Sequence, residues 1–182
     1  MIHHTRGLTL LEMLITLAIS AILLTVVAPN VQSILAANRV TSDINNISAL
    51  TQQARFSAIN EQQTILLCPT TNYSNCTSSW ANAKMIFADS NGNGSRDNSE
   101  PLIATTDPLS KTNRLSGISG SLTFEENGGI SRAATITICP SGGEAKDASA
   151  LLLSLYGRVV VANDSNNDGI KEDSDGDDLS CS

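Results

Sequence analysis

The chain has 182 residues, with 18 acidic and 11 basic side chains and a formal net charge of −7 at pH 7. An acidic chain is a poor general binder of nucleic acid, because contact with phosphate depends on clustered Lys and Arg. Aromatic residues make up only 3% of the chain, so its core must be aliphatic, and its length allows one modest domain plus a separate helix.

The first segment with a clear pattern is an apolar run over residues 8–31. As an α-helix it would be about 36 Å long, enough to cross a bilayer core of about 30 Å. Arg6 precedes the run, so the short N-terminal side is expected to stay in the cytoplasm. A secretory signal peptide would have its small-residue cleavage site after the apolar region. Here Gly7 comes before it, so a cut at Gly7 would leave the helix on the mature protein.

Glu12 is the exception within this apolar run. A carboxylate inside a membrane helix costs several kcal/mol unless it finds a partner, which makes Glu12 a candidate functional residue. The alternative is a Glu near the helix end whose carboxylate reaches the membrane interface.

The segment Gly7-Leu8-Thr9-Leu10-Leu11-Glu12 resembles the type III signal of type IV pilins and type II secretion pseudopilins, usually G-F-T-L-x-E. The resemblance implies that a prepilin peptidase cuts between Gly7 and Leu8 and that the new N-terminus on Leu8 is methylated. It also implies that Glu12 pairs with the N-terminal amine of a neighbouring subunit during filament assembly. Residues 1–7 would then be the leader, and residues 8–31 the membrane or filament-core helix.

The helix is expected to continue to about residue 60, with residues 32–60 as its amphipathic half. Its apolar positions recur at three- and four-residue steps and form a stripe suited to packing against a globular head. The stripe consists of Val40, Ile44, Ile47, Leu50 and Ala54.

Short strands separated by turns rich in Gly, Asn and Ser are predicted beyond residue 61. They cover residues 64–68, 84–88, 102–105, 121–124, 134–139, 151–155 and 158–162. The predicted fold class is α+β: a long N-terminal helix packed on a small antiparallel β-sheet head. That head takes in residues 61–182 and ends in an acidic tail.

Four cysteines, Cys68, Cys76, Cys139 and Cys181, follow the membrane segment and are expected in the periplasm, where disulfides form. Four cysteines allow three pairings. We favour Cys68–Cys76, which would close a short polar loop, and Cys139–Cys181, which would tie the acidic tail to a strand. A zinc site is the alternative, although the mature chain would contain no His and has no C-x-x-C pair.

Two loops rich in Asp, Asn and Gly have the ligand spacing of Ca²⁺-binding loops, in which a Gly permits the sharp turn. A hairpin turn without metal is the alternative for both, since Asn, Asp and Gly favour tight turns. Ca²⁺ is the one cofactor hypothesis, and no cofactor is required. The first loop, residues 89–100, offers Asp89, Asn91, Asn93, Asp97 and Glu100. The second offers Asp164, Asn166 and Asp168 before an acidic run that starts at Glu172.

The head resembles the FimT/FimU minor pilins and the related GspH pseudopilins. The matching segments are, in chain order, residues 67–69, Cys76 and residues 79–80, 85–94, 138–140 and 157–161. The resemblance implies a minor subunit near the pilus tip that primes assembly with the major and other minor pilins. Prepilin peptidase and the inner-membrane assembly platform would be further partners. The protein would lie in the inner membrane with its head in the periplasm, and later in the pilus at the cell surface.

Two other functions stay open. A GspH-like minor pseudopilin of a type II secretion system would have the same build. Some FimT proteins bind DNA through a G-R-x-R motif, which Gly157-Arg158-Val159-Val160 matches only at Arg158. Because Val160 takes the place of the second Arg and the acidic tail would repel phosphate, we expect no nucleic-acid partner. No enzymatic activity is expected either, since the mature chain would lack His and its cysteines are explained as disulfides.

Overall fold

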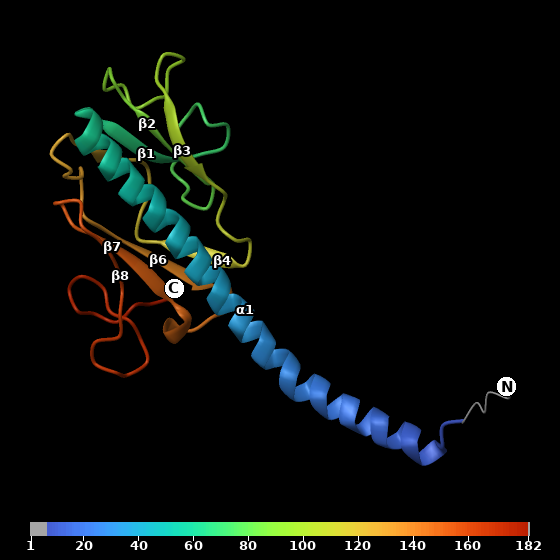
Figure 1. The fold of residues 1–182 in the computed structure, drawn as a ribbon. Helices are drawn as coiled ribbons and strands as arrows, with labels where there is room; N and C mark the ends of the chain where they lie inside the picture. Colours follow the sequence, from blue (N-terminus) through green and yellow to red (C-terminus); the bar gives the residue numbers. More distant parts are fainter. Residues whose placement is uncertain (1–6, 182) are drawn as a thin grey trace. The chain divides into compact units, whose positions relative to one another are not determined.

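The computed structural model describes residues 7–181, apart from the side chains at positions 26, 28 and 29. Arg6, on which the expected membrane orientation rests, lies outside the described residues. Helix α1 spans Leu10–Glu61, within two residues of the bounds expected from the sequence (Figure 1). Contacts within the chain form two compact units that divide inside α1, after Ala36.

The first unit is the apolar half of α1. Within the described part of the chain, α1 is the one helix long and apolar enough to cross a membrane, with a mean hydropathy of 2.5 over 18 residues. Its large side chains are exposed, from Leu8 at 67% to Ile34 at 60%. None of residues 7–181 covers this surface, so it requires a lipid or protein environment.

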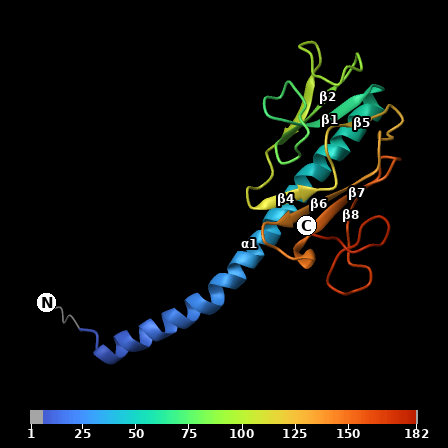
Figure 2. The same ribbon diagram turned by 180° about the vertical axis from the view of Figure 1, so that it is seen from behind.

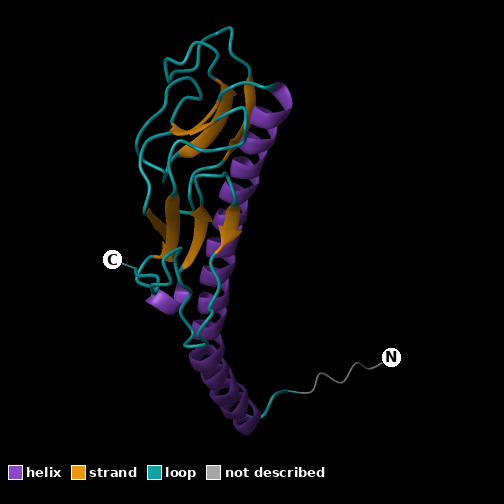
Figure 3. Cartoon of the chain, turned by 90° about the vertical axis from the view of Figure 1, so that its left-hand side faces the viewer, coloured by secondary structure: helices purple, strands orange, loops and turns teal. Residues whose placement is uncertain are grey.

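The second unit contains two four-stranded antiparallel sheets along the remainder of α1 (Figure 3). In the first sheet the order is β3-β2-β1-β5, with β1 at Ile65–Thr70, β2 at Ala83–Ala88, β3 at Leu102–Thr106 and β5 at Leu122–Phe124. In the second it is β4-β6-β7-β8, with β4 at Asn113–Ser116, β6 at Ala134–Pro140, β7 at Ser149–Leu153 and β8 at Val159–Val161. A single 3₁₀ turn, η1 at Ala145–Asp147, links β6 to β7. Figure 2 shows β5 beside β1.

One aliphatic core joins the helix to both sheets. The stripe expected from the sequence is confirmed: Val40, Ile44, Ile47, Leu50 and Ala54 are all buried, at 4% exposure or less. They pack in one cluster with Ile65 and Ile86 of the first sheet and Ile136 and Leu151 of the second. The α+β class with a long helix on antiparallel sheet is thus observed, with the sheet divided in two.

Strand β4 was not predicted, because its four residues carry only one large apolar side chain, Leu115. It exists through pairing with β6, from Asn113 opposite Pro140 to Ser116 opposite Thr137. Gly117 ends the strand at φ +87°, and a Cβ there would lie 1.9 Å from the carbonyl oxygen of Thr135. Such a strand depends on its neighbour, and a local pattern does not reveal it.

A buried carboxylate on α1 fixes the helix to the start of β4 and to the loop before it. The Asp43 carboxylate accepts hydrogen bonds from the Ser110 N–H and hydroxyl and from Asn113 Nδ2, the last at 2.6 Å. Lys84 of β2 is buried at 2% exposure. Its burial lowers the pKa of the amine from 10.5 to about 8, and the charge of Asp43 offsets part of that change. The lysine is therefore held in the head at a cost to its charged form.

This shift predicts a pH dependence of stability. Between pH 8 and 10.5 the unfolded chain keeps the Lys84 proton while the folded chain releases it. The free energy of unfolding should therefore rise with pH in this window, by at most about 1.4 kcal/mol per pH unit. Below the window the penalty on the charged lysine is fully present.

The measurement is denaturant unfolding of the full chain in detergent, followed by fluorescence of Trp80, the single tryptophan. Lys84→Met should remove this part of the slope, whereas the exposed Lys111→Met should keep the wild-type slope. A Lys84→Met protein with an unchanged slope would contradict the assignment.

Candidate functional site

The N-terminal site starts with a helix cap. Thr9 precedes α1, and its hydroxyl oxygen accepts the backbone N–H of Glu12 at 3.2 Å. This is the contact of an N-cap residue with the third helical residue. Glu12 therefore lies in the first turn of α1, where the helix dipole favours a negative charge. Helix stability alone would give Thr9 and Glu12 a role.

The carboxylate of Glu12 remains free to accept hydrogen bonds or to form an ion pair. Within residues 7–181 it makes no hydrogen bond or ion pair, because the contact with Thr9 engages the backbone N–H of Glu12 and not its carboxylate. Its exposed neighbours are apolar, with Leu11 at 67% and Met13 at 54% exposure. Gly7 and Leu8 lie just before the helix, and Gly7 has open space around its Cα. The bond between them is thus accessible to a peptidase in the single chain, while its cleavage stays a prediction.

Both disulfides join the cysteines in the pairing that we favoured. Cys68 and Cys76 are bonded with Cα atoms 5.5 Å apart, and Cys139 and Cys181 with Cα atoms 5.8 Å apart. The first bond closes the loop after β1. The second attaches the end of the acidic tail to β6, so the tail is part of the folded head.

Loss of the tail disulfide should cost more stability than loss of the short one. The two bonds close segments with sequence separations of 42 and 8 residues. Loop-closure entropy then gives about 4 kcal/mol for Cys139–Cys181 and about 2.5 kcal/mol for Cys68–Cys76. Paired Cys→Ser variants of each bond, melted in detergent and followed by Trp80 fluorescence, provide the comparison. A larger loss for the Cys68–Cys76 pair would contradict it.

The first Asp/Asn/Gly loop satisfies the carboxylates of Asp89, Asp97 and Glu100 internally. Asp89 accepts the N–H groups of Asn93 and Gly94, and Glu100 accepts those of Ser90 and Asp97, one on each carboxylate oxygen. The amide groups of Asn91 and Asn93 both donate to Asp97 Oδ2. These contacts explain the loop without metal, and Ca²⁺ here stays a prediction that no observation tests.

The second loop brings carboxylates together. One oxygen each of Asp164, Asp168 and Glu172 lies within 4.8 Å of the others, the only such group of three among the described residues. Asn166 instead donates to Asp168 Oδ2 at 3.1 Å. The pKa of Asp178 is raised, first by the charge of Asp168, then by burial and by Glu172, Asp177 and Asp164. Glu172 is the member of the trio that the motif did not single out, because the motif ends at Gly169.

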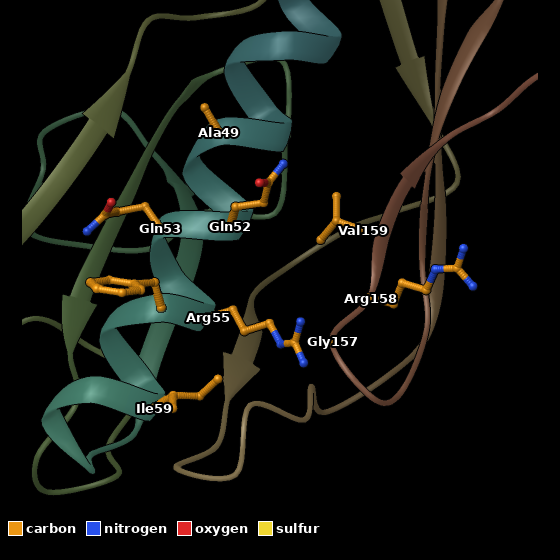
Figure 4. A pocket seen from close by; sticks show the side chains of 9 residues that line it. Ala49, Gln52, Gln53, Arg55, Ile59, Gly157, Arg158 and Val159 are labelled. Atoms are coloured by element: carbon orange, nitrogen blue, oxygen red, sulfur yellow. The ribbon is translucent and has the colours of Figure 1, made fainter.

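The turn before β8 carries Arg158. Its side chain is exposed, whereas Val160, where a second Arg would stand, is half-buried. A hollow of about 590 Å³ is lined by Gly157, Arg158 and Val159 together with Gln52, Arg55 and Phe56 of α1. Arg55 points toward Gly157, and its Nε donates to the carbonyl oxygen of Gly128 at 3.1 Å (Figure 4). The fold thus supplies a second Arg that no local motif could reveal, and whether this face binds nucleic acid stays untested.

The N-terminal helix is apolar in its first half and begins next to a processing-type motif. Its second half packs against an antiparallel sheet head. This combination defines a pilin-like subunit. The family model described as type II transport protein GspH matches residues 43–157, and the prokaryotic N-terminal methylation motif matches residues 2–28. The chain belongs to this GspH family. It is a membrane-anchored subunit of the minor pilin and pseudopilin class, and not an enzyme.

Solved structures show the same fold. The type IV minor pilin FimU of Pseudomonas aeruginosa PAO1 is 20% identical, with a TM-score of 0.54 over 69% of this chain and 90% of that chain. A second crystal form of FimU gives 19% identity and a TM-score of 0.52, over 68% and 92% of the two chains. The minor pseudopilin EpsH of the Vibrio cholerae type 2 secretion system gives 12% and 0.50, over 68% and 95%. A comparison with curated protein sequences found no match.

Proposed function

We propose that this protein is a minor pilin that helps to prime a type IV pilus near its tip, together with other minor pilins. FimU, whose fold the chain shares over 90% of that chain, is a type IV minor pilin. The observation that carries the proposal is Glu12, an exposed carboxylate without a partner in the described chain at the start of an apolar helix.

The chemistry proposed for Glu12 is charge neutralisation between subunits. Cleavage after Gly7 would create an amine on Leu8, whose positive charge at the same end of the helix is opposite to that of Glu12. Both charges are costly in an apolar surrounding when alone, and their attraction is strongest there. A carboxylate of one subunit paired with the amine of the next therefore favours the filament over the separate subunits.

The apolar half of α1 supports the same proposal. Its exposed side chains, such as Ile15, Leu17 and Leu24, could pack against lipid before assembly and against other pilin helices afterwards. The removal of lipid contacts then has little cost, and the Glu12 pair would set the axial position of each subunit. The head would face outward and contact other pilins.

Glu12→Ala should leave the precursor processed but reduce its incorporation by about tenfold or more, since an unpaired amine in an apolar site costs over 1.4 kcal/mol. Incorporation is measured by immunoblot of sheared pili against the membrane fraction. Glu61→Ala is the matched control, because Glu61 is an exposed carboxylate at the other end of the same helix. Wild-type incorporation of Glu12→Ala would refute the proposed role.

A role as a minor pseudopilin of a type II secretion system is the second candidate. The GspH family model and the EpsH fold favour it, and the same Glu12 chemistry would apply. Deletion of the gene separates the two: loss of surface pili with normal secretion supports the minor pilin, and the reverse result supports the pseudopilin. The neighbouring genes give an independent test: pilus genes beside this gene would support the minor pilin, and secretion genes would support the pseudopilin.

A further inference from the structure

The tail after β8 is drawn as loops in red (Figure 1). One of these loops, residues 163–172, is closed by a backbone hydrogen bond between its two ends. The backbone N–H of Glu172 donates to the carbonyl oxygen of Asn163 at 3.1 Å, and the N–H of Ser165 donates to Glu172 Oε2 at 2.8 Å. Within the loop, Asp164 accepts the N–H groups of Asn167 and Gly169. This backbone framework holds the carboxylates of Asp164, Asp168 and Glu172 together.

No Lys or Arg among the described residues forms a salt bridge with the three carboxylates. Their nearest oxygens lie within 4.8 Å of one another. Across residues 7–181 the one salt bridge joins Lys146 to Glu144. Lys171, adjacent in sequence, donates its amine to the carbonyl oxygen of Ala148 at 2.8 Å. Like charges this close repel unless a cation lies between them.

The burial of Glu172 is a second and independent indication that a cation binds at these carboxylates. The residue is 6% exposed, and its Oε1 is buried without a hydrogen-bond donor among residues 7–181. Buried carboxylate oxygens are almost always satisfied, because an unsatisfied one costs the full desolvation of that group. A buried carboxylate that keeps free lone pairs, and whose group lies within 4.8 Å of two other carboxylates, has the environment of a metal ligand.

The first Asp/Asn/Gly loop, residues 89–100, has a similar sequence and can be compared with the second. It starts with the same pattern, Asp89-x-Asn91-x-Asn93-Gly94, against Asp164-x-Asn166-x-Asp168-Gly169. There both oxygens of Glu100 accept N–H groups, and two amides donate to Asp97. Over these six residues the second loop has Asp168 where the first has Asn93, so its start carries one more carboxylate and one fewer amide donor.

We propose that the loop of residues 164–172 binds one Ca²⁺ ion through carboxylate oxygens of Asp164, Asp168 and Glu172. The set is all oxygen, which suits a hard cation, and the exposed side of the loop leaves room for the water ligands that complete six to eight contacts. Mg²⁺ fits less well, because it demands a nearly ideal octahedron at shorter distances. The bound ion would fix the loop between β8 and the Cys139–Cys181 disulfide.

The test uses the full chain in detergent, with CaCl₂ as the probe and MgCl₂ as the comparison. Calorimetry should detect one Ca²⁺ site, with a dissociation constant of about 0.1–1 mM as in extracellular modules. Ca²⁺ should also raise the melting temperature reported by Trp80, and a chelator should reverse the rise. Absence of both heat and a melting shift would overturn the proposal, as would equal binding of Mg²⁺.

Three variants locate the ion. Glu172→Gln should weaken Ca²⁺ binding at least tenfold, and so should Asp168→Asn, which gives the second loop the side chain that Asn93 contributes to the first. The Trp80 melting curve without Ca²⁺ shows whether each variant is folded, and the Asp168→Asn turn has its precedent within this chain. Asp97→Asn in the first loop is the matched control and should bind as the wild type does. Binding that survives Glu172→Gln and Asp168→Asn, or that is lost in Asp97→Asn, would place the ion elsewhere and overturn the assignment.

Discussion

Both sheets of the head depend on one surface, the aliphatic stripe on residues 37–61 of α1. The sheets are not hydrogen-bonded to each other, and each has only four strands. Their inner faces meet in a single cluster around Ile44, Ile47 and Leu50. Ala54 and Ala58, with no exposed surface, allow the strands to approach the helix closely. Two small sheets could not bury enough apolar area alone, so the helix is the shared half of both cores.

The same dependence explains which parts of the fold the sequence could predict. The stripe recurs at helical spacing, and strands such as β2 and β6 are apolar runs bounded by turn residues, so local patterns are sufficient. Strand β4 is different, because Asn113 and Arg114 gain strand geometry only from pairing with Pro140 and Cys139. Its existence is a tertiary property, and no window of sequence around it contains the cause.

The candidate sites show the same limit. Gly7, Leu8 and Glu12 could be proposed because their signal is contiguous in the chain. Arg55 beside Gly157 could not, since a helix and a distant turn supply the two sides of that hollow. For the two acidic loops the sequence shows the motif, but it does not distinguish a Ca²⁺ site from a hairpin turn without metal. In the first loop the amide groups of Asn91 and Asn93 point toward Asp97 and donate hydrogen bonds to its carboxylate. The sequence alone does not give the direction of these groups, which decides whether a carboxylate has donors within its own loop.

The carboxylates of this chain differ in whether the chain itself supplies their hydrogen-bond donors, and this difference distinguishes structural acids from candidate functional ones. Asp43 and Asp89 are buried, and each accepts at least two hydrogen bonds from the chain itself, as does Glu100. Buried acids here are therefore satisfied as a rule, which is the condition for a stable core. Glu172 breaks this rule, because its buried Oε1 has no donor among the described residues. Glu12 is a different case, an exposed carboxylate on an apolar helix surface. A buried oxygen without a donor, in a head that satisfies its other buried acids, is best explained by a cation from outside the chain, and the two carboxylates near Glu172 favour a small ion. For the role proposed for Glu12, the apolar surroundings favour instead a cation on another protein chain.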